Sequence, residues 1–117
     1  MYSPLLLDHF EHPRNVGEIP DATATAQIEN PACGDVLKLS LKIVNGRIAE
    51  VRFRAKGCVP AIACGSALTE LVVGRSVAEA KKIGTEEVAG VLGGLPEAST
   101  HAGQLALDAL AAALKKL

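Results

Sequence analysis

Two neighbouring segments of alternating apolar and polar residues constrain the fold more than any other feature of the sequence. The segment Val36–Val44 has leucine or isoleucine at every second position, and Arg47–Arg54 has Val51 and Phe53 in the same alternation. A period of two predicts β-strands that each bury one face. Since only Asn45-Gly46 separates the segments, we expect them to pair as an antiparallel hairpin.

The turn of this hairpin decides which side chains share a face. A two-residue turn in an unbroken ladder would place Leu39 across from Arg52, an apolar residue across from a charged one. A three-residue loop with Gly46 in the left-handed conformation, as in a G1 bulge, restores the parity. We therefore expect three loop residues, Leu39 across from Val51, and Ala49 on the core face.

The rest of the sequence predicts one weak strand and several helices. Thr23–Glu29 alternates only weakly and suggests an edge strand. Capping residues, prolines and glycines predict helices at about 5–11, 60–73, 77–82, 85–92 and 99–116. Strands followed by helices indicate an α+β fold, with helices covering one face of an antiparallel sheet. The last helix is expected to bury Leu107, Leu110, Leu114 and Leu117.

The composition is that of one globular domain, spanning residues 1–117. The net charge of −1 gives no basic surface for nucleic acid. We see no apolar run long enough to cross a membrane, and no signal peptide. The 3 cysteines, an odd number, argue against a secreted disulfide framework. We therefore predict a cytoplasmic protein with free or metal-bound thiols.

Two cysteines flank the predicted hairpin. Cys58 follows its second strand and precedes a helix, whose N-terminus favours the thiolate form that binds soft metals. Cys33 lies in a turn before the first strand, with Asp35 two residues further on. In an antiparallel pair, the start of one strand and the end of the other share a sheet edge. We therefore expect Cys33, Asp35 and Cys58 to lie close together.

Other candidate ligands differ in how well they fit such a site. His101 opens the last predicted helix and would complete a four-ligand set of the kind that zinc takes. Cys64 lies about 240° around its helix from Cys58, at roughly 100° per residue, so we predict a buried core residue. His9 and His12 are predicted to be solvated or capping residues rather than ligands.

Short motifs occur in order along nearly the whole chain. They are Tyr2–His9 with Pro13–Gly17, Pro31–Val36, Gly57-Cys58 with Ala61–Ala63, Leu68–Glu70, Gly74–Ser76, and Leu95-Pro96. Together they resemble the IscU/NifU-type iron–sulfur cluster scaffold family. The resemblance implies a three-stranded antiparallel sheet packed against helices. It also implies a [2Fe–2S] cluster, and it matches Cys33, Cys58, Asp35 and His101 to the family's cluster-binding positions.

The resemblance also implies partners, and it has two departures. A cysteine desulfurase would supply sulfur, and recipient apoproteins would take the cluster. Ala102 stands where the family has its third cysteine, and alanine neither binds iron nor accepts a persulfide. Glu97-Ala98-Ser99 stands where the family commonly has Pro-Val-Lys for a chaperone, so an Hsp70-type chaperone is not an expected partner.

Three functions remain open from the sequence. The first, which we favour, is a scaffold or carrier that binds iron, or zinc, and a [2Fe–2S] cluster with an altered ligand set. The second is a zinc-binding or regulatory paralogue that docks to a cysteine desulfurase without building clusters. The third is an enzyme with Cys58 as nucleophile, but no oriented base accompanies Cys58, so we predict no enzyme. A cysteine at Ala102 is expected to add a third thiolate beside His101 without disturbing the fold.

Overall fold

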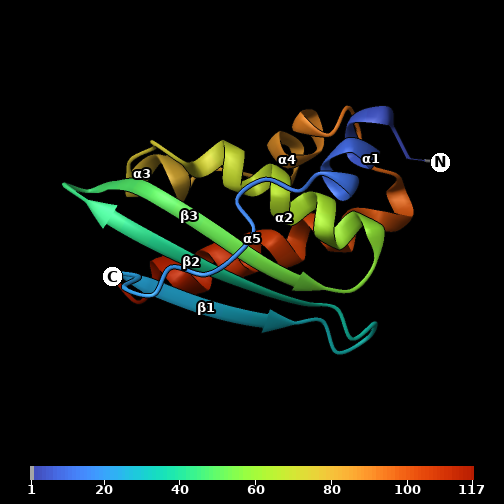
Figure 1. Cartoon of the computed structure of the whole chain (residues 1–117). Coiled ribbons are helices and arrows are strands. Elements are labelled where there is room, and N and C mark those ends of the chain that lie inside the picture. Colours follow the sequence, from blue (N-terminus) through green and yellow to red (C-terminus); the bar gives the residue numbers. More distant parts are fainter. Residues whose placement is uncertain (1) are drawn as a thin grey trace.

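The computed structural model describes residues 2–117, which form an α+β fold around one antiparallel sheet in the strand order β1-β2-β3. This architecture confirms the predicted fold class (Figure 1). In chain order the elements are α1 (Pro4–Glu11), β1 (Ala24–Glu29), β2 (Val36–Val44), β3 (Arg47–Lys56), α2 (Val59–Val72), α3 (Val77–Ala80), α4 (Thr85–Val91), the short 3-10 helix η1 (Glu97–Ser99) and α5 (Thr100–Leu114).

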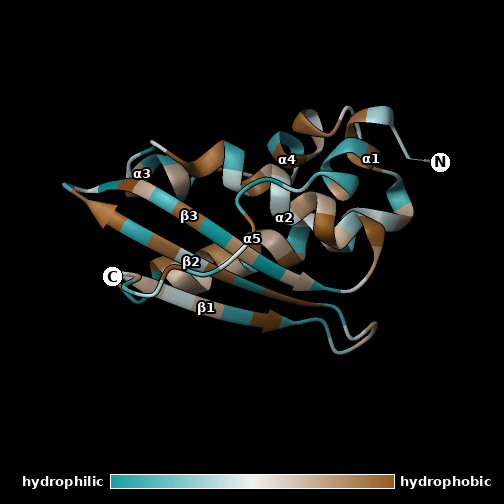
Figure 2. Cartoon of the chain, viewed as in Figure 1, coloured by the Kyte–Doolittle hydropathy of each residue, from teal (hydrophilic) through white to brown (hydrophobic). Residues whose placement is uncertain are grey.

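One face of the sheet forms the core with α2 and α5, and α1 packs on α2 (Figure 1). The alternation of apolar and polar residues is visible along the strands in Figure 2. The five central residues of the core face are each at most 2 % exposed; they are Leu37, Leu39, Leu41, Val51 and Phe53. The predicted core face of the hairpin is thus confirmed for these residues. None of the helices within residues 2–117 has the length and apolar character needed to cross a bilayer.

The turn of the hairpin is shorter than predicted. Val44 pairs with Arg47, so the loop contains only Asn45 and Gly46. Both residues have positive φ, 54° and 74°, as a type I′ turn requires. The positive φ of Gly46 is confirmed, but the three-residue loop is wrong. The twist of a type I′ turn matches that of the strands, which explains why the shorter loop is stable.

A bulge in β3 brings the apolar residues of β2 and β3 onto the same face, which the two-residue turn alone would not do. Glu50 pairs with Lys42 and Ile48 pairs with Ile43, so Ala49 has no partner across the ladder. Ile48 is buried and Ala49 is exposed, which makes the predicted core position of Ala49 wrong. The predicted pairing of Leu39 is also wrong, because Leu39 lies across from Phe53.

Helix α1 is capped as its sequence indicates, and it buries a histidine. The Oγ atom of Ser3 accepts a hydrogen bond from the N–H of Leu6 at 3.0 Å, and Pro4 occupies the first helical turn. His9 is only 3 % exposed, and its Nδ1 lies 2.7 Å from the Oγ of Ser66 in α2. The prediction of a solvated or capping His9 is therefore wrong, because this side chain joins α1 to α2.

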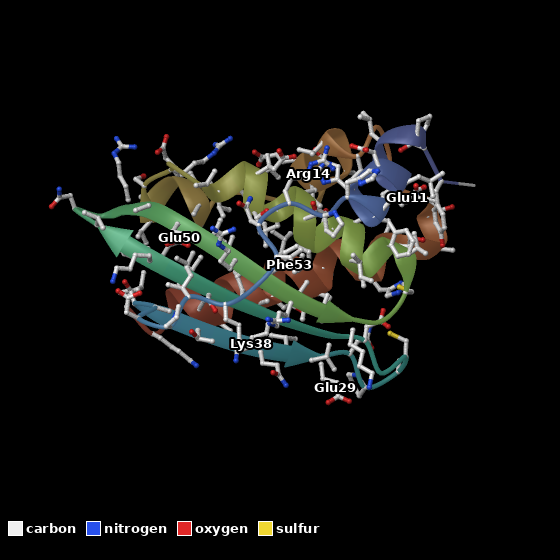
Figure 3. All side chains as sticks on the ribbon, viewed as in Figure 1. Glu11, Arg14, Glu29, Lys38, Glu50 and Phe53 are labelled. Atoms are coloured by element: carbon white, nitrogen blue, oxygen red, sulfur yellow. The ribbon has the colours of Figure 1, made fainter. Side chains whose placement is uncertain are left out.

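The segment after α1 follows the edge of β3 and then crosses the outer face of the sheet. The N–H of Gly17 donates to the carbonyl of Phe53 at 2.9 Å. Further along, Glu18 pairs with Lys38, which is labelled on β2 in Figure 3. Asp21 pairs with Lys42 in the same way. These contacts fix the chain on the face of the sheet opposite the helices.

Alanines form much of the buried stripe of α5. The buried residues repeat with helical spacing; they are Ala102, Gly103, Leu105, Ala106, Ala109, Leu110, Ala113 and Leu114. The prediction is confirmed for Leu110 and Leu114. It is wrong for Leu107, which is half-buried, and for Leu117, which is 50 % exposed. Small side chains allow the helix to lie close to the sheet and α2.

Candidate metal centre

Three segments that are far apart in the sequence meet at one end of the molecule. They are the loop between β1 and β2, the junction between β3 and α2, and the start of α5 (Figure 1). The loop carries Cys33 and Asp35, the junction carries Cys58, and α5 carries His101 as its second residue. The sheet places the first two segments side by side because Val36 and Lys56 are partners in the β2–β3 ladder.

The loop that carries Cys33 is closed by its own hydrogen bonds. The side-chain oxygen of Asn30 accepts from the N–H of Ala32 at 3.0 Å, and the carbonyl of Asn30 accepts from the N–H of Gly34 at 2.7 Å. The N–H of Asn30 donates to the carbonyl of Asp35 at 2.8 Å. Asn30 was not among the predicted site residues, although an Asn-Pro pair is a known signal for such a turn.

Asp35 binds Cys58 through both of its carboxylate oxygens. The N–H of Cys58 donates to Oδ1 at 3.3 Å, and the thiol of Cys58 donates to Oδ2 at 3.0 Å. Asp35 is only 4 % exposed, whereas Cys58 is exposed. The buried carboxylate therefore fixes the exposed thiol at the start of α2.

Asp35 also belongs to a second group, which includes the other two predicted residues. One ligand atom from each of Cys33, Asp35 and His101 lies within 4.8 Å of the other two. Cys33 and His101 are exposed, so this group opens to solvent. Asp35 thus connects Cys58 to the group, and all four predicted site residues lie at the same end of the molecule.

The protonation of the Asp35–Cys58 pair follows from their contact. The hydrogen bond from Cys58 is the main cause that lowers the pKa of Asp35, and Cys33 and the nearby His101 act in the same direction. Burial, followed by the hydrogen bond to Asp35, raises the pKa of the Cys58 thiol. A backbone N–H at the start of α2 lowers it by a smaller amount. The helix N-terminus thus acts on Cys58 in the predicted direction, but burial and Asp35 outweigh it.

Two further positions bear on the number of available thiolates. Cys64 is fully buried, which raises the pKa of its thiol to about 12 and confirms the prediction of a core residue. Ala102 is also fully buried and belongs to the hydrophobic core, although its neighbour His101 is exposed. A sulfur atom added at Ala102 would begin among core atoms. The expectation of a third thiolate that leaves the fold undisturbed stays a prediction, and the burial of Ala102 counts against it.

A cavity of about 310 Å³ adjoins the centre on the side of His101. It is lined by Glu29 at the end of β1, which is labelled in Figure 3, and by Asn30 of the cysteine loop. Gln104 and Asp108 of α5 form the opposite wall. The cavity leaves the imidazole accessible from outside.

The four side chains offer the donor atoms of a transition-metal site. Two sulfurs and one imidazole nitrogen suit zinc and iron, and a carboxylate is an accepted fourth ligand. One ligand atom from each of Cys33, Asp35 and His101 lies within 4.8 Å of the other two, so at most a small movement of the loop and α5 would bring the three onto one ion. Exposure of Cys33 and His101 leaves these two side chains free to move.

Comparison with known proteins identifies the family of the chain. The sequence pattern of the NifU-like N-terminal domain matches residues 1–117. The chain belongs to this family. It is 44% identical over 114 residues to the iron–sulfur cluster assembly scaffold protein IscU 1 of Archaeoglobus fulgidus, covering 97% of this chain and 74% of the relative.

Other NifU-like relatives come from distant organisms. The chain is 41% identical over 116 residues to the scaffold protein IscU of Aquifex aeolicus, covering 97% of this chain and 74% of that protein. It is 43% identical over 120 residues to the mitochondrial iron sulfur cluster assembly protein 2 of Saccharomyces cerevisiae, covering 98% of this chain and 76% of that protein.

Solved structures share the NifU-like fold. A candidate iron–sulfur cluster assembly scaffold protein for the SUF system of Fervidobacterium islandicum superposes with a TM-score of 0.82 at 19% identity, covering 97% of this chain and 96% of that chain. The N-terminal part of a NifU-like protein of Brucella abortus gives 0.78 at 18% identity, covering 97% and 92%. At these identities the structures show the common fold alone.

Proposed function

We propose that this chain is a scaffold on which an iron–sulfur cluster is assembled, with Cys33, Asp35, Cys58 and His101 as the ligands. The observation that carries the proposal is the convergence of these four side chains at one end of a NifU-like domain. The names of relatives that are more than 40% identical over nearly the whole chain support it. The cluster is cargo in this function, and the protein performs no catalytic step.

The exposed and buried ligands would have different tasks. Cys33 and His101 are exposed and lie on a loop and on a helix start, so they are the side chains that incoming iron and sulfur meet first. Asp35 is buried and holds Cys58 by two hydrogen bonds. Iron that replaces the thiol proton would exchange the Cys58–Asp35 hydrogen bond for metal–ligand bonds.

The partners in this proposal follow from the chemistry of the site. Sulfur would come from a cysteine desulfurase, and the finished [2Fe–2S] cluster would pass to recipient apoproteins. The open position of Cys33 and His101 supports both transfers, because a partner could reach the cluster without unfolding the domain. A cytoplasmic location stays a prediction from the sequence.

A zinc-binding paralogue that docks to a desulfurase is the second candidate. The buried Ala102 favours it, because the chain offers only two thiols at the centre and iron–sulfur clusters are usually held by thiolates. Two sulfurs, one nitrogen and one oxygen satisfy zinc with four ligands. The two candidates therefore share one site and differ in the cargo.

Anaerobic reconstitution with iron and sulfide distinguishes them. A scaffold should develop visible charge-transfer absorption, with iron and sulfide bound in equal amounts. A paralogue should stay colourless and retain one zinc ion for each chain. Either outcome should depend on Cys33 and Cys58, so Cys33→Ala and Cys58→Ala should lose the bound metal.

Cys64→Ala is the matched control, because it removes a thiol that is fully buried in the core. It should retain the metal or cluster of the unmodified chain. Loss of metal in Cys64→Ala, or its retention in both Cys33→Ala and Cys58→Ala, would show that the ligands have been assigned wrongly.

A further inference from the structure

Gly57, the residue between β3 and α2, lies where the backbone approaches Asp35 most closely. A Cβ atom on residue 57 would lie 2.3 Å from Oδ1, 2.6 Å from Cγ and 3.0 Å from Cβ of Asp35. Contacts between such atoms are normally longer than 3.4 Å. The φ angle of Gly57, +153°, is a conformation that other residues rarely adopt. Only glycine therefore fits this position without moving its surroundings.

The Asp35 side chain has little freedom to make room. It is 4 % exposed, and both of its oxygens accept hydrogen bonds from Cys58. Its backbone carbonyl accepts a hydrogen bond from the N–H of Asn30, which closes the cysteine loop. A side chain at Gly57 would push the carboxylate away from Cys58, or push the turn that carries Cys58 away from Asp35.

We propose that Gly57 is a positioning residue for the metal centre. The missing side chain lets the Asp35 carboxylate lie against the backbone, where it binds Cys58 on one side and remains near Cys33 and His101 on the other. A sharp turn would by itself explain a glycine at this position. In addition, Gly57 sets the distance between the ligands. It rests on the ligand set of the proposed function.

The test compares two glycine-to-alanine variants with Co²⁺ as the probe. Gly57→Ala introduces the clash with Asp35. Gly46→Ala is the matched control, because Gly46 also has positive φ, +74°, and an added Cβ meets nothing within 4 Å. Residues that orient metal ligands typically change affinity by about 10–100-fold. We expect Gly57→Ala to weaken Co²⁺ binding at least tenfold and to weaken the thiolate-to-cobalt absorption, whereas Gly46→Ala stays within about twofold of the unmodified chain.

A stability effect alone would overturn the proposal. If Gly57→Ala is less stable but binds Co²⁺ with the affinity and spectrum of Gly46→Ala, then Gly57 serves only the turn. If Gly57→Ala does not fold, adding Asp35→Ala should restore folding, because this change removes the two closest atoms of the clash. Failure to restore folding would show that backbone strain at residue 57, and not the contact with Asp35, causes the loss, and it would overturn the proposal.

Failure of the Gly57 proposal can be distinguished from failure of the proposed function. If the unmodified chain fails to bind Co²⁺, the ligand assignment is wrong. Urea unfolding of Gly57→Ala, Asp35→Ala and the double variant still measures the contact without any metal. We expect the two substitutions to be strongly non-additive, with Gly57→Ala less harmful when Asp35 is already alanine. Additive effects would refute the contact between Gly57 and Asp35 as the cause.

Discussion

Gly65 in α2 offers a test of how closely this helix must lie to the sheet. A Cβ atom at Gly65 would lie 2.7 Å from Cδ2 and Cε2 of Phe53 and 3.2 Å from Cδ1 of Leu37. Phe53 is 2 % exposed and Leu37 is fully buried, so neither side chain can retreat into solvent. Phe53 is labelled near the middle of the sheet in Figure 3. The substitution Gly65→Ala therefore sets helix propensity against core packing.

The two effects have opposite signs and different sizes. Alanine in place of glycine inside a helix stabilises by about 1 kcal/mol. Extra methyl groups in a packed core destabilise by about 1–3 kcal/mol. Because two ring atoms would be approached to 2.7 Å, we expect packing to prevail and Gly65→Ala to destabilise the fold by roughly 1 kcal/mol. For a chain of this length, that lowers Tm by about 4 °C.

Gly103→Ala in α5 is the matched control. Gly103 is also buried in a helix, but an added Cβ would lie 3.6 Å from Leu95 and 3.8 Å from Thr85, at ordinary contact distance. We expect this variant to gain about 1 kcal/mol. Urea unfolding with linear extrapolation measures both. If Gly65→Ala is stabilised as much as Gly103→Ala, the close packing of α2 on Phe53 is refuted. If it is destabilised, Phe53→Leu should reduce the effect.

Three further predictions concern the hairpin, the buried histidine and the third-cysteine position. Gly46→Val should lower stability by about 1 kcal/mol or more in urea unfolding, because a β-branched residue resists positive φ; an unchanged midpoint would contradict the type I′ turn. Burial lowers the pKa of His9 below 6.5, so the unfolded chain binds the proton more tightly. Stability should therefore fall as the pH drops from above 6.5 towards the folded-state pKa, and His9→Gln should lose this part of the pH dependence. An equal pH dependence in both proteins would show that His9 does not titrate as its burial requires. In Ala102→Cys the new thiol should react slowly with a thiol reagent while the exposed Cys33 reacts fast, since Ala102 is fully buried; a fast-reacting thiol that the unmodified chain lacks would show that the start of α5 opens.

The strands and the helix caps were predictable because their signals are local. The alternation in Val36–Val44 predicted the bounds of β2 correctly, and Ser3 with Pro4 predicted the start of α1. The burial of Cys64 followed from its angle around α2 relative to Cys58. These features depend on periodicity and on backbone chemistry within a few residues, which the sequence expresses directly.

The hairpin shows where local signals are insufficient. The sequence correctly required that Leu39 and Phe53 share a face, but parity can be restored either in the turn or within a strand. The protein restores it with a bulge at Ala49, directly after Ile48, the first buried residue of β3. The choice depends on how β3 continues along its other edge, where Gly74 and Arg75 bind the backbone of Ile48.

The identity of the candidate ligands came from the sequence, whereas their burial, their hydrogen bonds and the direction of their pKa shifts came from the tertiary structure. The order of strands alone placed Cys33, Asp35 and Cys58 near one sheet edge. The raised pKa of Cys58, the absence of space for a side chain at Gly57 and the burial of Ala102 depend on distances between segments that no local pattern encodes. Solvent exclusion and close contact arise only when the loop, α2 and α5 pack together, and those two effects decide which of the four side chains is held and which is open to solvent.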